Sequence, residues 1–403
     1  MKKKFIIGST ILILVGLVGL VLLLGPRLGI GIRSFVDFES GRLSSCEKNM
    51  NLFSEAPVQM DKLTRIGPLG SLDPAGGHVF PVDHTYLFTT AQTGSVDAGK
   101  SGEVDVWSPG SAHLTRVAYI EYSEGNTVVD KDYSIYFQPC REVEAAFYHI
   151  KSLSPELISQ LGDKLKLQHE GTTGQHTQRR FEAKTNIELR AGDFIGKAGG
   201  TFRSQAFDFR LVDKRTDALA YANPSRWGKP QQHIVCPFDY FTEPLKGQFM
   251  SLMGSAVGQR STSPVCGRID QDIKGTVQGA WFTEMTKETY PEDPHLALAH
   301  DDIKPSKPIF SIGTSMGKSG LKAGLYSFDV KKTGMLNRDF NAVTEVGKIY
   351  CYQGLKGKWG DSIAKVVMVE LVDDKTMRME ARSGLSCVGI DWAFSDRMTV
   401  FER

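Results

Sequence analysis

Apolar and polar positions alternate along most of the chain after residue 100, and this alternation predicts β-strands. The clearest runs are 104–107, 117–122 and 349–352. The same pattern recurs at 134–137, 366–371 and 376–380. Glycines and the pairs Asp-Lys and Asp-Asp separate the runs, as tight turns between strands require. The pattern therefore predicts a mainly β chain.

One short helix and a second β domain are also predicted. Ser154 suits the N-cap and Pro155 the first turn of a helix that runs to Leu161. From residue 265 onward we expect seven or eight antiparallel strands, the last of them at 399–403. We expect these strands to form a small barrel or sandwich of loosely lipocalin-like architecture.

The start of the chain holds one uncharged apolar block, Phe5–Leu24. Its length of about 20 residues matches the hydrocarbon core of a bilayer when helical. Lys2–Lys4 precede the block, so the positive-inside rule keeps the N-terminus cytoplasmic and the bulk of the chain extracytoplasmic. The alternative is a cleaved signal peptide, but Gly25–Gly29 offers no convincing small-x-small cleavage site. The prediction is a single-pass, signal-anchored protein of the cell membrane.

Composition narrows the class of protein further. Of 403 residues, 41% are hydrophobic and 23% are charged, which excludes wholesale disorder. The formal net charge of +2 gives no electrostatic footprint for nucleic acid. Pro and Gly gather between about 235 and 265, where the strand pattern weakens, and we place a domain boundary there. The predicted parts are a cytoplasmic stub (1–4), the transmembrane anchor (5–24), a juxtamembrane linker (25–69), a first β domain (70–240), a linker (241–264) and a C-terminal β domain (265–403).

Cysteine usage agrees with an oxidising location outside the cytoplasm. Six widely spaced cysteines, with no CxxC pair, permit a disulfide framework with 15 connectivities. We favour Cys351–Cys387, in adjacent predicted strands, and Cys236–Cys266, which flank the boundary region. The alternative is six buried thiols.

Four segments of the first domain carry residues suited to metal or acid–base chemistry. Gly76–His84 holds two histidines and an aspartate, and His149 lies in a strand before the short helix. The other two segments, Val104–Gly110 and Leu189–Asp213, contain a Ser-Pro-Gly turn, several glycines and the sequence Phe-Asp-Phe at 207–209.

In order and spacing these segments resemble the lysostaphin/LytM-type zinc endopeptidases, which cut peptide crosslinks in bacterial cell walls. The resemblance covers roughly residues 70–215 and implies a LytM-like antiparallel β-sandwich. It places His149 at the catalytic-histidine position and Phe207–Phe209 where a final His-x-His-Phe is expected. Both histidines of that last motif are absent here.

The ligand set that the resemblance leaves is degenerate. Asp208 replaces the zinc-binding histidine of the last strand, and His78 and Asp83 are five residues apart where the family has four. The remaining ligands for zinc are His84, Asp208 and, tentatively, His78, with His149 as the catalytic residue if the site is active.

These departures favour a pseudoenzyme, an outward-facing cell-envelope protein whose peptidase-like domain acts in binding or scaffolding. Its expected partners are the membrane, through the N-terminal helix, and a cell-wall peptide or glycan, or an envelope protein. One alternative is an active zinc metallopeptidase with an altered ligand set. A second alternative is an envelope ligand carrier that uses the C-terminal β-barrel.

Overall fold

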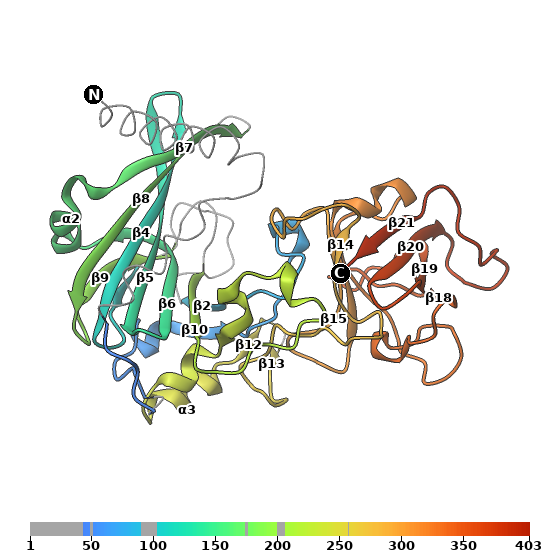
Figure 1. The fold of residues 1–403 in the computed structure, drawn as a ribbon, viewed down its shortest axis with the longest axis horizontal. Helices are drawn as coiled ribbons and strands as arrows, with labels where there is room; N and C mark the ends of the chain where they lie inside the picture. The colour runs from blue at the N-terminus through green and yellow to red at the C-terminus, as the bar shows by residue number, and fades with distance from the viewer. Residues whose placement is uncertain (1–42, 49–50, 90–102, 174–175, 200–205, 257) are drawn as a thin grey trace, which may run out of the picture. The chain divides into compact units, whose positions relative to one another are not determined.

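The structure is a computed structural model that describes residues 43–403, except 49–50, 90–102, 174–175, 200–205 and 257. Residues 46–403 cluster into one compact unit. Two large sheets organise this unit, and each is built from antiparallel strand pairs (Figure 1).

The fold class expected from the sequence, a transmembrane helix before two β domains, is wrong. The described residues form a mainly β, sandwich-like chain with antiparallel sheets and a half-barrel. Its two α-helices, α2 (Pro155–Leu161) and α3 (Leu245–Ser251), have seven residues each, whereas a bilayer span needs about 20. No helix in the described part of the chain is long and apolar enough to cross a membrane. The block Phe5–Leu24, on which the anchor was predicted, lies outside the described residues.

The first sheet contains eleven strands. Its main path runs β1-β2-β10-β6-β5-β4-β8-β7, while β11 pairs with β10, and β9 pairs with β3 and β6. The strands are β1 (Leu63–Gly67), β2 (Thr85–Thr89), β3 (Val104–Trp107), β4 (Ala112–Glu124), β5 (Thr127–Cys140), β6 (Val143–Leu153), β7 (Lys166–Thr173), β8 (His176–Leu189), β9 (Phe194–Ala198), β10 (Phe207–Asp213) and β11 (Ile234–Val235). Strand β1 falls inside 25–69, the range expected to be a linker.

Strand β10 lies between β2 and β6 in this sheet. Asp208 lies opposite Tyr86 of β2 on one side and opposite Tyr148 of β6 on the other. Successive side chains of a strand point to opposite faces, so Phe207 and Phe209 enter the core and Asp208 faces the other way. Aromatic packing in that core holds β10 in place.

The second sheet contains eight strands, as predicted, in the order β17-β16-β15-β14-β21-β20-β19-β18. They are β14 (Gly279–Thr283), β15 (Leu296–His300), β16 (Pro308–Ile312), β17 (Gly324–Ser327), β18 (Ile349–Tyr352), β19 (Lys365–Leu371), β20 (Thr376–Ser383) and β21 (Thr399–Glu402). Fully buried Trp281, Phe310 and Tyr352 belong to its core. A small antiparallel pair of two-residue strands, β12 (Gly254–Ser255) and β13 (Gly258–Gln259), precedes it in the chain.

The loop before β2 packs against the second sheet. Phe80 lies in one apolar cluster with Phe282, Ala297 and Ala299. The Ser311 hydroxyl donates to the Val79 carbonyl at 2.7 Å, and this contact is buried. One loop is therefore shared by both sheets.

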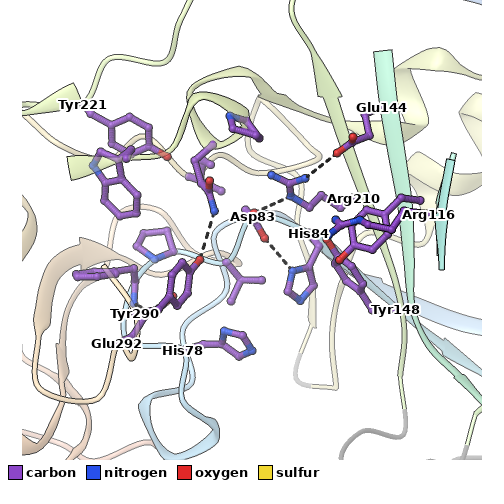
Figure 2. A pocket seen from close by; sticks show the side chains of 18 residues that line it. His78, Asp83, His84, Arg116, Glu144, Tyr148, Arg210, Tyr221, Tyr290 and Glu292 are labelled. Atoms are coloured by element: carbon purple, nitrogen blue, oxygen red, sulfur yellow. Dashed lines mark hydrogen bonds and ion pairs between the residues drawn. The ribbon is translucent and has the colours of Figure 1, made fainter. Parts of the chain in front are cut away.

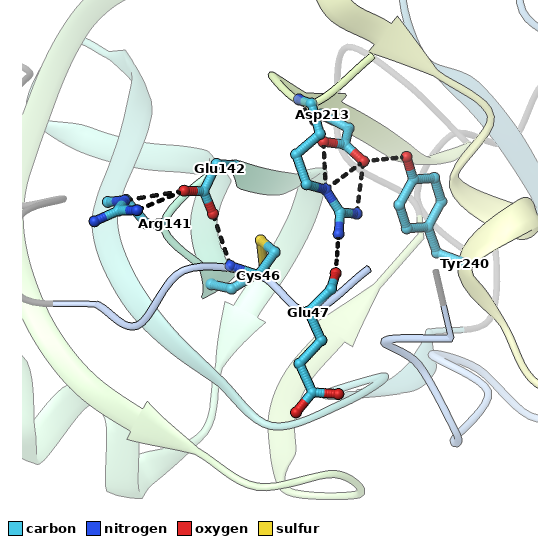
Figure 3. Close-up of a disulfide and its surroundings, with 8 residues drawn as sticks. Cys46, Glu47, Arg141, Glu142, Asp213 and Tyr240 are labelled. Atoms are coloured by element: carbon cyan, nitrogen blue, oxygen red, sulfur yellow. Dashed lines mark hydrogen bonds and ion pairs between the residues drawn. A yellow bond between two sulfur atoms is a disulfide. The ribbon is translucent and has the colours of Figure 1, made fainter. Parts of the chain in front are cut away.

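Three disulfides cross-link the unit. Cys236–Cys266 and Cys351–Cys387 confirm the pairs favoured from the sequence, and Cys46–Cys140 is the third. Figure 3 shows how the third is supported: Glu142 accepts from the Cys46 amide at 2.7 Å and from Arg141 at 3.0 Å.

Tyr240 and Arg215 reinforce the same region. The Tyr240 hydroxyl donates to Asp213 at 2.6 Å, and Arg215 bonds both Asp213 and the Glu47 carbonyl (Figure 3). The segment around residue 47 is thereby tied to the end of β10.

Candidate functional site

Three of the four residues predicted as a site meet at Asp208. The Nε2 atoms of His84 and His149 lie 3.3 and 3.2 Å from the same Asp208 oxygen, Oδ2. His84 directly precedes β2 and His149 lies in β6, the two strands that flank β10. The antiparallel register therefore brings together residues that are far apart in the sequence.

Each histidine is oriented by a second carboxylate. His84 Nδ1 lies 3.0 Å from Asp83 Oδ1, and His149 Nδ1 lies 2.7 Å from Asp132 Oδ2. A carboxylate at Nδ1 fixes the tautomer and turns Nε2 toward its target. Two carboxylate–imidazole pairs thus converge on the buried Asp208.

The charge of His149 follows from these contacts. Burial lowers the pKa of His149, but Asp208 and Asp132 outweigh it and raise the pKa to about 10. His149 is therefore an imidazolium at neutral pH. Its backbone adopts φ 62°, a left-handed conformation that non-glycine residues seldom take and that is often found at functional sites.

His78, the fourth predicted residue, lies beside this cluster. Its ring centroid is 5.7 Å from that of His84. Burial and the neighbouring His84 lower the pKa of His78, so it is neutral at pH 7. His78 lines a pocket next to the cluster.

A zinc ion would need the donor atoms around Asp208 at tetrahedral spacing. Ligand atoms at the corners of a tetrahedral zinc site with bonds of about 2.0–2.1 Å are about 3.3 Å apart, close to both measured N···O separations. Asp208 Oδ1 is also buried without a hydrogen-bond partner. However, the one described set of three donor atoms within 4.8 Å of one another is Cys46, Cys140 and Glu142.

The donors near Asp208 therefore do not fit zinc as they stand. His84 and His149 approach the shared oxygen without coming within 4.8 Å of each other, so no point is within bonding distance of all three donors. The Cys46–Cys140 group does not fit either, because its sulfurs are joined in a disulfide. The cluster is better described as an ion network in which the cation between two carboxylates is His149 itself.

A cavity of about 340 Å³ opens beside His84. Figure 2 shows its two walls, with Asp83 between them. One wall comes from the first sheet and contributes Arg116, Glu144 and Arg210. The other wall comes from the segments around residues 221–231 and 290–292.

The charges of the first wall are paired with each other. Arg210 Nε donates to Asp83 Oδ2 at 2.7 Å, and its Nη1 lies 3.9 Å from Glu144. Burial raises the pKa of Asp83, but Arg210 and His84 outweigh it and hold it well below the ordinary range. Arg116 lies over the Tyr136 ring at 3.5 Å.

The second wall is aromatic with one buried carboxylate. Tyr221 stacks on Trp227 with ring centroids 4.5 Å apart, and Tyr290 accepts from the Gln231 amide at 3.4 Å. Glu292 is 6% exposed, and one of its oxygens accepts from the Phe80 amide at 2.9 Å. Burial raises the pKa of Glu292 to about 7.

The sequence pattern did not reveal this second wall. Glu292 reaches the loop of Phe80 across 212 positions, and the segment around it has no motif. Tyr221 and Trp227 lie in a stretch with little strand pattern, and the one available signal was an aromatic pair next to prolines.

Comparison with known proteins adds no relative: no protein-family model, no curated protein and no solved structure matches this chain. The likeness to the lysostaphin/LytM-type endopeptidases stays a prediction from the motifs.

Proposed function

We propose that this chain is a non-catalytic, extracytoplasmic binding protein that holds a small polar ligand in the cavity beside His84. The observation that carries the proposal is the cavity itself, whose walls combine aromatic side chains with a few fixed polar groups. Pockets of about 300–1,000 Å³ with such a lining are the usual form of small-molecule sites. A cell-wall peptide or amino sugar is a ligand of suitable size and polarity.

Two further features support this proposal. Three disulfides are typical of proteins that work in an oxidising compartment outside the cytoplasm. In addition, Asp208 and His149 neutralise each other within a buried network, which suits a structural support for the pocket wall.

Ligand binding by the full-length protein tests the proposal directly. Thermal unfolding is measured with amines, amino acids, dipeptides, sugars and carboxylates, since a ligand that binds only the native state raises the melting temperature. At least one class is expected to stabilise the wild type and to lose its effect in Tyr221→Ala. Tyr119→Ala is the matched control, because Tyr119 stacks on Phe181 of the neighbouring strand and is not among the lining residues. No stabilisation by any class contradicts the proposal.

Metal content separates this function from the zinc peptidase. The purified protein is expected to contain no stoichiometric zinc after exposure to micromolar zinc. Near-equimolar zinc that disappears in His84→Ala and Asp208→Ala, but persists in His113→Ala, contradicts the non-catalytic proposal. His113 is a suitable control because, among the described residues, its ring bonds Asn186 in an exposed contact away from Asp208.

A further inference from the structure

Glu292 differs from the other pocket carboxylates because no described Arg, Lys or His lies within 4.0 Å of it as an ion-pair partner. Asp83 pairs with Arg210, and Glu144 lies near the same guanidinium. Glu292 makes no ion pair with any described residue: the backbone amides of Phe80 and Val79 bond it, and His84 acts on it only as a smaller electrostatic influence. A buried carboxylate without a counter-ion either takes up a proton or receives a cation from outside.

The side chains next to Glu292 suit a cation. The Phe80 amide donates to Glu292, and the Phe80 ring packs edge-on against Trp227 with ring centroids 5.3 Å apart. Tyr221 stacks on Trp227. Burial, then Asp83 and then Glu292 raise the pKa of the Tyr290 phenol, so Tyr290 lies near both carboxylates. Figure 2 shows Tyr221, Tyr290 and Glu292 on the same side of the pocket. The faces of aromatic rings attract organic cations, and a nearby carboxylate adds to this attraction.

The opposite wall does not offer an equivalent site for an anion. Arg210 is bonded to Asp83, and Arg116 pairs with Glu182 at 3.4 Å while stacking on Tyr136. An incoming anion would meet carboxylates beside both guanidinium groups. Carboxylates therefore outnumber the free guanidinium groups of the lining, and Glu292 is the lining carboxylate that no described Arg or Lys pairs with.

We infer that the pocket binds ligands through an ammonium group, which sits against the Glu292 carboxylate and the rings of Tyr221, Trp227 and Tyr290. This inference rests on the proposed binding function and names its ligand class. Amines and quaternary ammonium compounds belong to this class, whereas neutral or anionic analogues of the same shape do not.

Isothermal titration of the full-length protein at pH 8 tests the inference. Choline is the probe, and 3,3-dimethyl-1-butanol is the matched control, since it has the same shape without the charge. Choline is expected to bind at least about tenfold more tightly than the alcohol, as a charge-assisted contact implies. Glu292→Gln should remove this preference. Glu121→Gln, at a buried carboxylate outside the pocket lining, should preserve it.

The outcomes separate this inference from the proposed function. Equal binding of choline and the alcohol, or a preference that survives in Glu292→Gln, overturns the ammonium site and leaves a binding pocket. Binding of only sugars or carboxylates from the wider ligand set has the same consequence. If no compound of any class binds, the proposed binding function itself fails.

Discussion

The buried Glu292 carboxylate should make the stability of this protein depend on pH in a specific window. The pKa of Glu292 is about 7, raised by burial from 4.5, while the unfolded chain has the ordinary value. A carboxyl whose pKa is raised on folding stabilises the native state when protonated. This contribution is complete below about pH 4.5 and is lost as the pH rises through 7.

The size of the effect follows from the shift. At 1.36 kcal/mol per pKa unit, a rise from 4.5 to about 7 corresponds to about 3 kcal/mol, most of which is lost between pH 5 and pH 8. Glu292→Gln keeps the hydrogen-bonding oxygen for the Phe80 amide and removes the charge. The variant should therefore gain about 2–3 kcal/mol relative to the wild type when the pH rises from 5 to 8.

Urea unfolding followed by tryptophan fluorescence measures this difference. Both proteins are unfolded at pH 5 and at pH 8 with their disulfides intact. At each pH, the unfolding free energy of the wild type is subtracted from that of the variant, and the two differences are compared. Asp83, Tyr86 and Tyr290 lie near the same carboxylate and are present in both proteins, so their own contributions cancel to first order. A difference that is the same at both pH values refutes the reasoning.

Three other predictions concern the network, a disulfide and the ligand. In urea unfolding, His149→Gln should destabilise the protein by about 3 kcal/mol at pH 6, because two buried carboxylates lose their cation. This loss of stability should become smaller as the pH rises toward 10, where His149 of the wild type also loses its charge. Retention of the full deficit above pH 10 would contradict this. Replacing Cys46 and Cys140 by serine opens a link across 94 positions and should cost about 4 kcal/mol or more, measured against the oxidised wild type; no loss would show that this link is dispensable. Choline, whose charge does not titrate, should bind about tenfold more weakly at pH 6 than at pH 8 in calorimetry, since Glu292 becomes protonated; an equal affinity would argue against the contact.

Local pattern predicted the strands well because their alternation records which side is buried. Val104–Trp107 and Ile349–Tyr352 are strands with the predicted bounds, and the helix after Ser154 begins as its N-cap signal indicated. The Ser154 hydroxyl accepts from the Leu157 amide, which is the contact expected of that cap. These features depend on neighbours within a few residues, so the sequence contains them in full.

The site was predicted only in part, for the opposite reason. His84, His149 and Asp208 lie together because β6, β10 and the residue that precedes β2 are neighbours in one sheet. The orienting carboxylate Asp132 and the pocket residue Glu292 come from β5 and from a loop of the second sheet. Their positions depend on tertiary packing, which no local pattern in a single sequence specifies.

The shared loop at Phe80 has a consequence for how the molecule unfolds. Its ring packs on Phe282 of the second sheet, and its amide holds Glu292 from the same part of the chain. Separation of the sheets would expose an aromatic cluster and break a buried hydrogen bond in a single event. The two halves should therefore melt as one cooperative unit, and calorimetry should show one heat-absorption peak, with equal calorimetric and van't Hoff enthalpies. A ligand that tightens this loop would then delay the melting of strands far beyond its own contacts.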